Sequence, residues 1–511
     1  MLFDERRTTF VLSDAPRQKI LLGLTVLILG LAGTARPEEA TKYELRATTT
    51  PDQFQRVRVL LEVSGQLKIN GEDKKVTQVP LQVNGELLYD ERVLKSDTQN
   101  KCRSSVRYYD TAAAELRIGE TSQKTSLHPD RRLAATQVTA TETVLFSPLA
   151  PFTRDELELL ETQANSAALY RLLPDKAISL GQSWNHDNSA VAALLCLDAI
   201  TQTDVKSTLR QVEKSLAIVD LEGSVNGSVR GVSSDIQVRG KYNFDLKQGT
   251  FTWITLSISE KRASSAAEPG FEVVAKLREV LAPTPPRAEL SDATIKDLTL
   301  DPGPGSTLLS LASSAGRFQL LHTRQWRVMM DRTDLTVLRM LDQGDLIAQC
   351  NASRLPDLPA GQRVSVESFQ ADVKRALGEH FGEFRDVTQE STDGGLRVLR
   401  AVVSGTASEL PIQWSYYHLS DDKGHQAAIV FTMDARLVEK FAEADRTIIS
   451  SFAFTGSAEA APETATETAP VAAPAAAPDA AAPAAPKSGD AKPEAATAAR
   501  PSSGAVRQPR R

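Results

Sequence analysis

The sequence predicts an α+β protein: an N-terminal antiparallel β-meander domain with a helical cover, a second region of mixed strands and helices, and a disordered C-terminal tail. Three observations predict this class. Apolar residues alternate with polar ones throughout the first region, which is typical of strands. Amphipathic helical stretches alternate with strands in the second region. From residue 456 onward, alanine, proline and threonine replace the large apolar residues that a core needs.

Residues 1–35 read as a signal segment. Arg17 and Lys19 precede an apolar run at 20–32, and Gly33-Thr34-Ala35 follows as a small-x-Ala cleavage pattern. The run is shorter than the roughly 20 residues that span a bilayer, which favours cleavage over anchoring. We therefore expect an exported protein of the periplasm or extracellular space, with an uncleaved N-terminal membrane anchor as the alternative.

Residues 40–298 are expected to form the β-rich domain. Asn70-Gly71, Asn84-Gly85 and Asn226-Gly227 lie in or beside alternating apolar runs. Asn-Gly favours the positive φ of a tight hairpin, so a turn is expected at each pair. The runs at 235–246 and 250–259 should pair as neighbouring antiparallel strands.

Two helical stretches should cover this meander. Thr153 and Glu156 form a capping-box pattern that opens a helix extending to Pro174, and residues 190–200 form a second helical stretch. A covered, curved sheet resembles the half-barrel lipoprotein carriers of bacterial envelopes, and this resemblance implies a lipid ligand. The resemblance is to the architecture alone and no motif supports it, so a filled apolar core is the interpretation that the sequence favours.

Proline and glycine mark a linker at 299–314, and a second domain follows at 315–455. Its pattern predicts strands at 318–322 and 326–331, a helix capped by Ser365, and a closing helix from Val438 to Phe452. Three further strands precede that closing helix.

The end of this domain carries a family resemblance. The last strand, residues 425–432 (HQAAIVFT), and the closing segment, residues 445–452 (DRTIISSF), resemble the Mog1/PsbP family. The resemblance implies an α/β/α sandwich over residues 315–455. It implies no function, because members of that family bind different partners, and it transfers no binding residue.

Charge and cysteine content narrow the possible functions. The 511 residues carry a net charge of -6, and the basic residues are interspersed with acids. Nucleic-acid binding needs clustered Lys and Arg, so no nucleic-acid partner is expected. The three cysteines, Cys102, Cys196 and Cys350, form no C-x-x-C pair and are expected to be buried free thiols, with one disulfide as the alternative.

No catalytic, cofactor-binding or metal site is predicted. The sequence contains neither a G-x-S-x-G nor an H-E-x-x-H motif. The best metal hypothesis brings His418 and His425 together across a hairpin, completed by Asp421 or Asp422, although ordinary polar hairpin ends explain these residues better. A second polar cluster, Trp184-Asn185-His186-Asp187, is better explained as a packing corner than as a sugar platform.

The sequence therefore predicts a non-enzymatic exported envelope protein that acts as a binding or scaffold module. A carrier of an apolar, lipid-like ligand is the first alternative, and a hydrolase with an unrecognised site is the second. The partner would be an envelope protein, a lipid or a polymer, with no cofactor, and with a membrane only if the N-terminal segment stays uncleaved. The tail at 456–511 would serve as a spacer, or as a tether with a basic tip.

Overall fold

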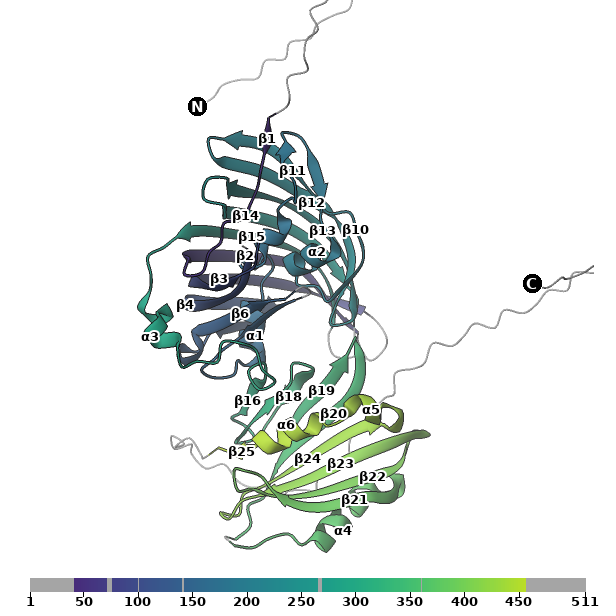
Figure 1. Ribbon diagram of the computed structural model, residues 1–511. Coiled ribbons are helices and arrows are strands. Elements are labelled where there is room, and N and C mark those ends of the chain that lie inside the picture. The colour runs from purple at the N-terminus through teal and green to yellow at the C-terminus, as the bar shows by residue number, and fades with distance from the viewer. Residues whose placement is uncertain are drawn as a thin grey trace, which may run out of the picture. The chain divides into compact units, whose positions relative to one another are not determined.

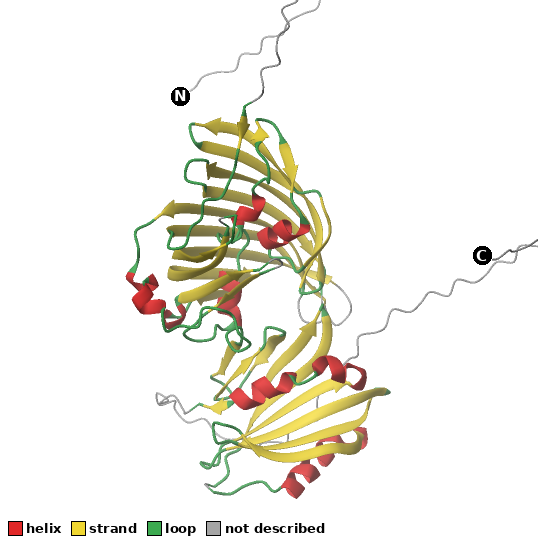
Figure 2. Cartoon of the chain, viewed as in Figure 1, coloured by secondary structure: helices red, strands yellow, loops and turns green. Residues whose placement is uncertain are grey.

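The computed structural model describes residues 41–455, except 71–75, 100, 140–141, 265–268 and 360. The predicted signal segment and the predicted tail lie outside the described residues, and the division into domains stays a prediction. Antiparallel strands dominate the described chain (Figure 2). The longest helix, α4, has 12 residues, and the other α-helices have four to eight. The predicted α+β class is therefore wrong, because the helices are too short and too few to form layers.

One sheet contains 13 strands in the order β7-β6-β4-β3-β2-β15-β14-β13-β12-β11-β9, with β5 beside β4 and β10 beside β12. Its long central strands are β2 (Phe54–Asn70), β3 (Val76–Ser96), β4 (Cys102–Ile118), β12 (Leu216–Val229), β13 (Val232–Asp245), β14 (Thr250–Arg262) and β15 (Gly270–Pro283). The shorter ones are β5 (Thr121–Ser126), β6 (Leu133–Val138), β7 (Thr143–Phe146), β9 (Ser183–Asn185), β10 (Ala199–Thr203) and β11 (Lys206–Glu213).

Two of the predicted hairpin turns are wrong. Asn84 lies inside β3, opposite Glu62 of β2, and Asn226 lies inside β12, opposite Asp235 of β13. Neighbouring strands pair on both sides of these positions, and this pairing overrides the local turn preference. The turn after β12 falls instead at Arg230-Gly231, where both residues have positive φ. The expected pairing of 235–246 with 250–259 is confirmed.

The sheet has an inner and an outer face. The inner face packs against α1 (Arg154–Leu160), a short 3-10 turn (Leu169–Leu172) and α2 (Asn188–Leu195), which lie on one side of the curved stack of strands (Figure 1). The Thr153–Glu156 capping box is confirmed. The helix it opens ends at Leu160 rather than near Pro174, so the predicted helical cover is replaced by two short helices and irregular chain.

The chain after β15 crosses the outer face. A 3-10 turn (Ala288–Leu290) and α3 (Asp292–Ile295) place Leu290 and Ile295 in a small core with Val106, Leu133 and Phe146. We call residues 284–298 the connector.

Two further sheets follow. The smaller contains β16 (Leu309–Ser313), β17 (Phe318–His322) and β25 (Ala453–Phe454). The larger contains seven strands in the order β18 (Trp326–Asp331), β19 (Thr336–Asp342), β20 (Asp345–Leu355), β24 (Gln426–Asp434), β23 (Leu410–Ser420), β22 (Arg397–Ala407) and β21 (Phe381–Ser391). β1 (Lys42–Tyr43) and β8 (Ile178–Ser179) form a separate two-stranded pair.

Short helices contact this seven-stranded sheet without forming the predicted α/β/α sandwich. α4 (Val366–Leu377), capped by Ser365 as expected, packs mainly against β21–β23. The predicted closing helix is divided into α5 (Val438–Phe441) and α6 (Ala444–Ser451). Helical layers would have to extend across the sheet, and these segments are too short to do so.

Candidate functional site on the inner face of the large sheet

A row of polar side chains crosses the inner face. Gln55, Glu91 and Arg107 lie directly opposite one another on β2, β3 and β4. The Glu91 carboxylate accepts hydrogen bonds from Arg107 Nε and Ser105 Oγ, both at 2.8 Å, from Gln55 Nε2 at 2.7 Å and from Ser166 Oγ at 2.8 Å. Every acceptor position of this buried carboxylate therefore has a donor.

Arg107 makes further contacts inside the core. Its Nη2 donates to Asn165 Oδ1 at 2.6 Å and to Ser166 Oγ at 3.0 Å, and its guanidinium carbon lies 4.9 Å from the centre of the Tyr89 ring. Tyr89 Oη in turn lies 3.0 Å from Ser166 Oγ. The segment that carries Asn165 and Ser166 is thus joined to β3 and β4 by a hydrogen-bonded charge pair.

The electrostatics of the pair follow from this geometry. Burial alone would raise the pKa of Glu91. The charge of Arg107 and the hydrogen bonds that the Glu91 carboxylate accepts lower that pKa below its ordinary value instead. Burial would likewise lower the pKa of Arg107, and the neighbouring Glu91 raises it instead. Both groups are therefore charged in the folded protein and neutralise each other.

A third buried ionisable group, Glu279 of β15, differs from them. It is 1% exposed, and neither carboxylate oxygen has a hydrogen-bond partner. Burial raises its pKa well above the usual value, while Arg107 opposes the shift and Glu91 adds to it. Burial without a hydrogen-bond partner therefore favours the protonated form of Glu279.

The polar row is closed to ligands. The hollow beside it is lined by residues that include Thr49, Glu91, Cys102 and Tyr170, and the side chains of Glu91 and Arg107 are 1% and 2% exposed. A substrate cannot reach Glu91 or Arg107 in this conformation. The cluster therefore positions the chain across the inner face, and a ligand would have to bind elsewhere.

The inner face becomes progressively exposed toward one end of the sheet. On β2, Val57 is 0% exposed and Val59 3%, whereas Ile69 on the same face is 40% exposed. Apolar side chains that share this face at the exposed end are all partly buried, and we call them the apolar strip: Leu61, Val63, Leu67, Val79, Leu81, Val83, Leu116, Ile118 and Phe271. They come from four adjacent strands, β15, β2, β3 and β4.

Strand register makes the strip continuous. Phe271, Leu67 and Val79 lie opposite one another in one row. Val63 and Val83 lie opposite one another in another row, which Leu116 extends onto β4. Side chains opposite one another on neighbouring strands are in contact distance, so the strip forms one apolar surface.

The two histidines of the metal hypothesis have different partners. His418 Nε2 lies 2.9 Å from Gln426 Oε1, and the His418 ring contacts Phe369 of α4. His425 Nδ1 lies 2.7 Å from Asp421 Oδ2, and its ring contacts Phe454. Within residues 41–455 as described, no group of three or more His, Cys, Asp or Glu side chains is arranged to hold a metal ion.

The second predicted cluster is a packing corner. Trp184 Nε1 donates to the carbonyl of Leu172 at 3.0 Å, and His186 Nε2 lies 2.8 Å from Ser207 Oγ. Asp187 caps α2 by accepting a hydrogen bond from Ala190 N at 2.7 Å. Burial lowers the pKa of His186 to about 4, so the ring is neutral.

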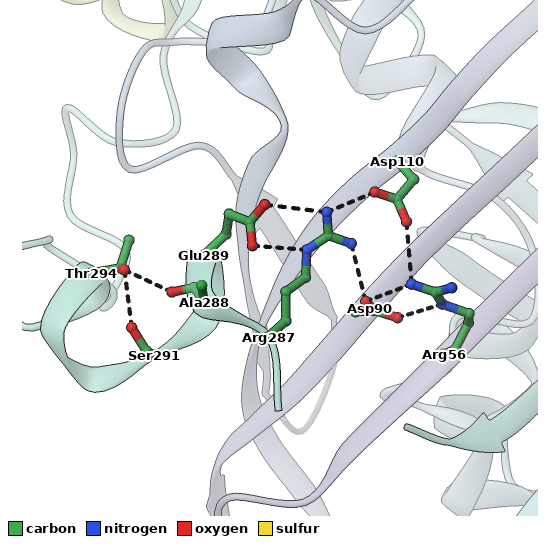
Figure 3. Close-up of polar contacts among 8 residues, drawn as sticks. All are labelled: Arg56, Asp90, Asp110, Arg287, Ala288, Glu289, Ser291 and Thr294. Atoms are coloured by element: carbon green, nitrogen blue, oxygen red, sulfur yellow. Dashed lines mark hydrogen bonds and ion pairs between the residues drawn. The ribbon is translucent and has the colours of Figure 1, made fainter. Parts of the chain in front are cut away.

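A charge network ties the connector to the outer face (Figure 3). Arg287 lies 2.8 Å from Asp110 and 3.1 Å from both Asp90 and Glu289, and Arg56 binds Asp90 at 2.7 Å. The Arg287 guanidinium also lies 4.4 Å from the centre of the Tyr108 ring. The network holds the chain that leaves β15 against β3 and β4, across the sheet from the polar row.

Comparison with known proteins does not assign this chain a fold or a function. No family model and no curated protein sequence matches the chain. A structure of lipovitellin and its lipid–protein interactions is 8% identical, covers 47% of this chain and 26% of its own, and has a TM-score of 0.28. A BenF-like porin from Pseudomonas fluorescens Pf-5 is 7% identical, covers 75% of this chain and 98% of its own, and has a TM-score of 0.12. This chain thus spans about a quarter of the lipovitellin chain, and similarities this weak assign neither fold nor function.

No described helix is both long and apolar enough to cross a lipid bilayer.

Proposed function

We propose that this protein is an exported, non-enzymatic binding protein that carries an apolar, lipid-like ligand on the apolar strip. The increase in exposure along the inner face of β2, from Val57 at 0% to Ile69 at 40%, is the observation that carries the proposal. The chain covers the end of the inner face that holds the polar row and leaves the apolar strip at the other end partly exposed. A contiguous exposed apolar surface is a common mark of a binding site.

The free energy gained by covering the strip scales with the apolar area that a ligand removes from water. Burial of apolar surface contributes about 25 cal/mol per Å², so covering roughly 300 Å² would contribute about 7 kcal/mol. The entropy lost on binding offsets part of this. An affinity in the micromolar range, which corresponds to about 8 kcal/mol, would therefore require a ligand that buries more apolar area than this.

The closed polar row supports a non-catalytic role. Glu279, Tyr89 and Cys102, whose pKa values burial raises, are all buried, and Glu279 has no partner to orient it. A general acid or nucleophile must reach its substrate. The polar row therefore offers the hydrolase alternative no accessible acid or nucleophile.

A fluorescent apolar probe tests the proposal. N-phenylnaphthylamine should bind saturably to the full chain, and palmitate should displace it. The double substitution Leu67→Gln and Leu81→Gln places two polar groups on the strip and should weaken probe binding about tenfold, equivalent to 1.4 kcal/mol. The matched control is Leu60→Gln, which changes a partly buried leucine on the outer face of the same strand. Wild-type protein without saturable binding, or equal loss in the control, would refute the proposal.

A further inference from the structure

The outer face of β13–β15 carries a regular array of cations. Two rows cross these strands: Arg239–Ser257–Lys276 and Lys241–Thr255–Arg278. All four cationic residues are exposed. A hydroxyl-bearing residue of β14 thus lies between two cations in each row.

The spacing suits a phosphate-sized anion. Neighbouring strands lie about 4.8 Å apart and alternate residues about 7 Å apart along a strand, so the four Cα atoms outline a rectangle of roughly 10 by 7 Å. Lys and Arg side chains are long enough to converge above β14 from its two sides. Ser257 is exposed between them, and its hydroxyl can donate to an oxygen of the same anion.

Three of the four cations are unpaired, unlike other cations on this face. Lys261 binds Glu272 at 3.0 Å, and Arg58 binds Glu86 at 2.8 Å. Lys241 is 3.6 Å from Asp220. Arg239, Lys276 and Arg278 form no ion pair with any part of the chain that the structure describes. Glu222 lies opposite Arg239 and Glu62 lies opposite Lys276 in the strand register, but neither carboxylate forms an ion pair with them among the described residues. These cations are therefore available to an external anion.

Exposed apolar side chains border the cations on the same face. Along β15, Val274, Lys276, Arg278 and Val280 alternate with inward-facing residues, and the two valines are 40% and 38% exposed. Trp253 lies opposite Val280 on β14 and is partly buried. Cations bordered by exposed valine and tryptophan match the layered chemistry of a lipid headgroup region, where phosphates lie above the first acyl carbons.

We propose that this outer patch, formed by Arg239, Lys241, Lys276 and Arg278 with Val274, Val280 and Trp253, docks on the surface of anionic phospholipid bilayers. The cations contact lipid phosphates, and the valines and Trp253 enter the interface. Each basic residue near an anionic membrane contributes about 1 kcal/mol, so the three cations without an ion pair contribute roughly a 100-fold preference for anionic over neutral membranes at low salt. This docking uses the face opposite the apolar strip and does not depend on the proposed ligand.

The test is co-sedimentation of the full chain with vesicles of phosphatidylcholine alone or mixed with phosphatidylglycerol. The wild type should prefer the anionic vesicles, and added salt should weaken binding. Lys276→Glu/Arg278→Glu should lower the affinity for anionic vesicles at least about tenfold. The control, Arg375→Glu/Lys423→Glu, makes the same change in net charge at exposed positions of the second region and should bind like the wild type. Equal binding to both vesicle types, or equal loss in the two variants, would overturn the proposal.

A second variant separates a bilayer from a soluble anion. Val274→Ser/Val280→Ser keeps every charge and should weaken vesicle binding about threefold, because less apolar surface enters the interface. Unchanged binding by this variant, or complete displacement by soluble glycerol phosphate, would mean that the patch recognises phosphate without a membrane and would overturn the bilayer proposal. Because the Leu67→Gln/Leu81→Gln variant leaves the outer face intact, it should still bind anionic vesicles, so failure of one proposal is distinguishable from failure of the other.

Discussion

Glu91 Oε1 and Arg107 Nε lie 2.8 Å apart on adjacent strands, with side chains that are 1% and 2% exposed. A buried pair of this kind contributes little net stability, yet removing one partner leaves an uncompensated charge in the core. The pair therefore acts mainly to hold the segment that contains Asn165 and Ser166 against the inner face, because both residues form hydrogen bonds with it.

Breaking this pair should be strongly destabilising. Arg107→Met should lower the free energy of unfolding by about 3–5 kcal/mol, because Glu91 would remain charged or would have to bind a proton in the core. Guanidinium denaturation measures the change. Glu91→Leu/Arg107→Met should cost less than the sum of the two single substitutions, and additive losses would contradict the coupling.

Glu279→Gln should stabilise the protein at neutral pH. The native pKa of Glu279 lies well above 4.5, so the unfolded chain releases this proton at a lower pH than the folded chain. The free energy of unfolding should therefore fall as pH rises above about 4.5, by about 1.4 kcal/mol per pH unit from this group, until the native pKa is reached.

Unfolding curves measured between pH 4 and pH 8 check the sign of this effect. Glu279→Gln should remove this contribution to the pH dependence, while Glu272→Gln on the outer face of the same strand should retain it. A Glu279→Gln profile parallel to that of the wild type would show that the buried carboxyl group titrates normally.

Arg287→Gln should release the connector without unfolding the sheet. Arg287 binds Asp90, Asp110 and Glu289, so its loss should cost about 1–3 kcal/mol and expose the amides of residues 288–298 to exchange. Hydrogen exchange with mass spectrometry measures this change. Unaltered protection of the connector would indicate that Leu290 and Ile295 hold it without the charge network.

The three thiols should react slowly in the folded protein. Cys102 and Cys350 are buried free cysteines, as expected, whereas the residue Cys196 is exposed, contrary to the expectation for its apolar context. Burial raises the pKa of Cys102 and of Cys196 to about 12, and Cys196 Sγ donates to the carbonyl of Thr162 at 3.3 Å. Iodoacetamide at pH 8 should therefore modify the thiols slowly in the folded protein, Cys196 first, and all three quickly in guanidinium, and rapid labelling of Cys102 without denaturant would contradict the described core.

Local signals predicted local features well. Ser365 caps α4, and Asp421–Gly424 forms the hairpin between β23 and β24. These features depend on neighbouring residues alone. Asn84-Gly85 carries an equally clear turn signal, but β2 and β4 pair across it from both sides, and distant strands are not visible in a local pattern.

Strand β21 was missed for a related reason. It is an edge strand with two register shifts against β22, and most of its residues are polar and exposed, so it shows no simple alternation.

The sequence gives only a weak indication of the polar row. Gln55 and Glu91 occupy positions in phase with the buried residues Val57 and Tyr89, and such out-of-place polar residues mark buried networks. The apolar strip could not be predicted, because its residues alternate in the sequence like those of the buried core. They differ only in that no other part of the described chain covers them completely.

The pairing of β2 with β15 has a kinetic consequence. These strands are neighbours in the middle of the large sheet, with Lys68 opposite Gly270, yet β3–β14 separate them along the chain. High contact order slows folding, and strand β2 presents an unpaired edge until the chain has been completed as far as β15. We expect a chain truncated before residue 270 to aggregate through that edge, and the emerging polypeptide to need a holding chaperone until β15 is available.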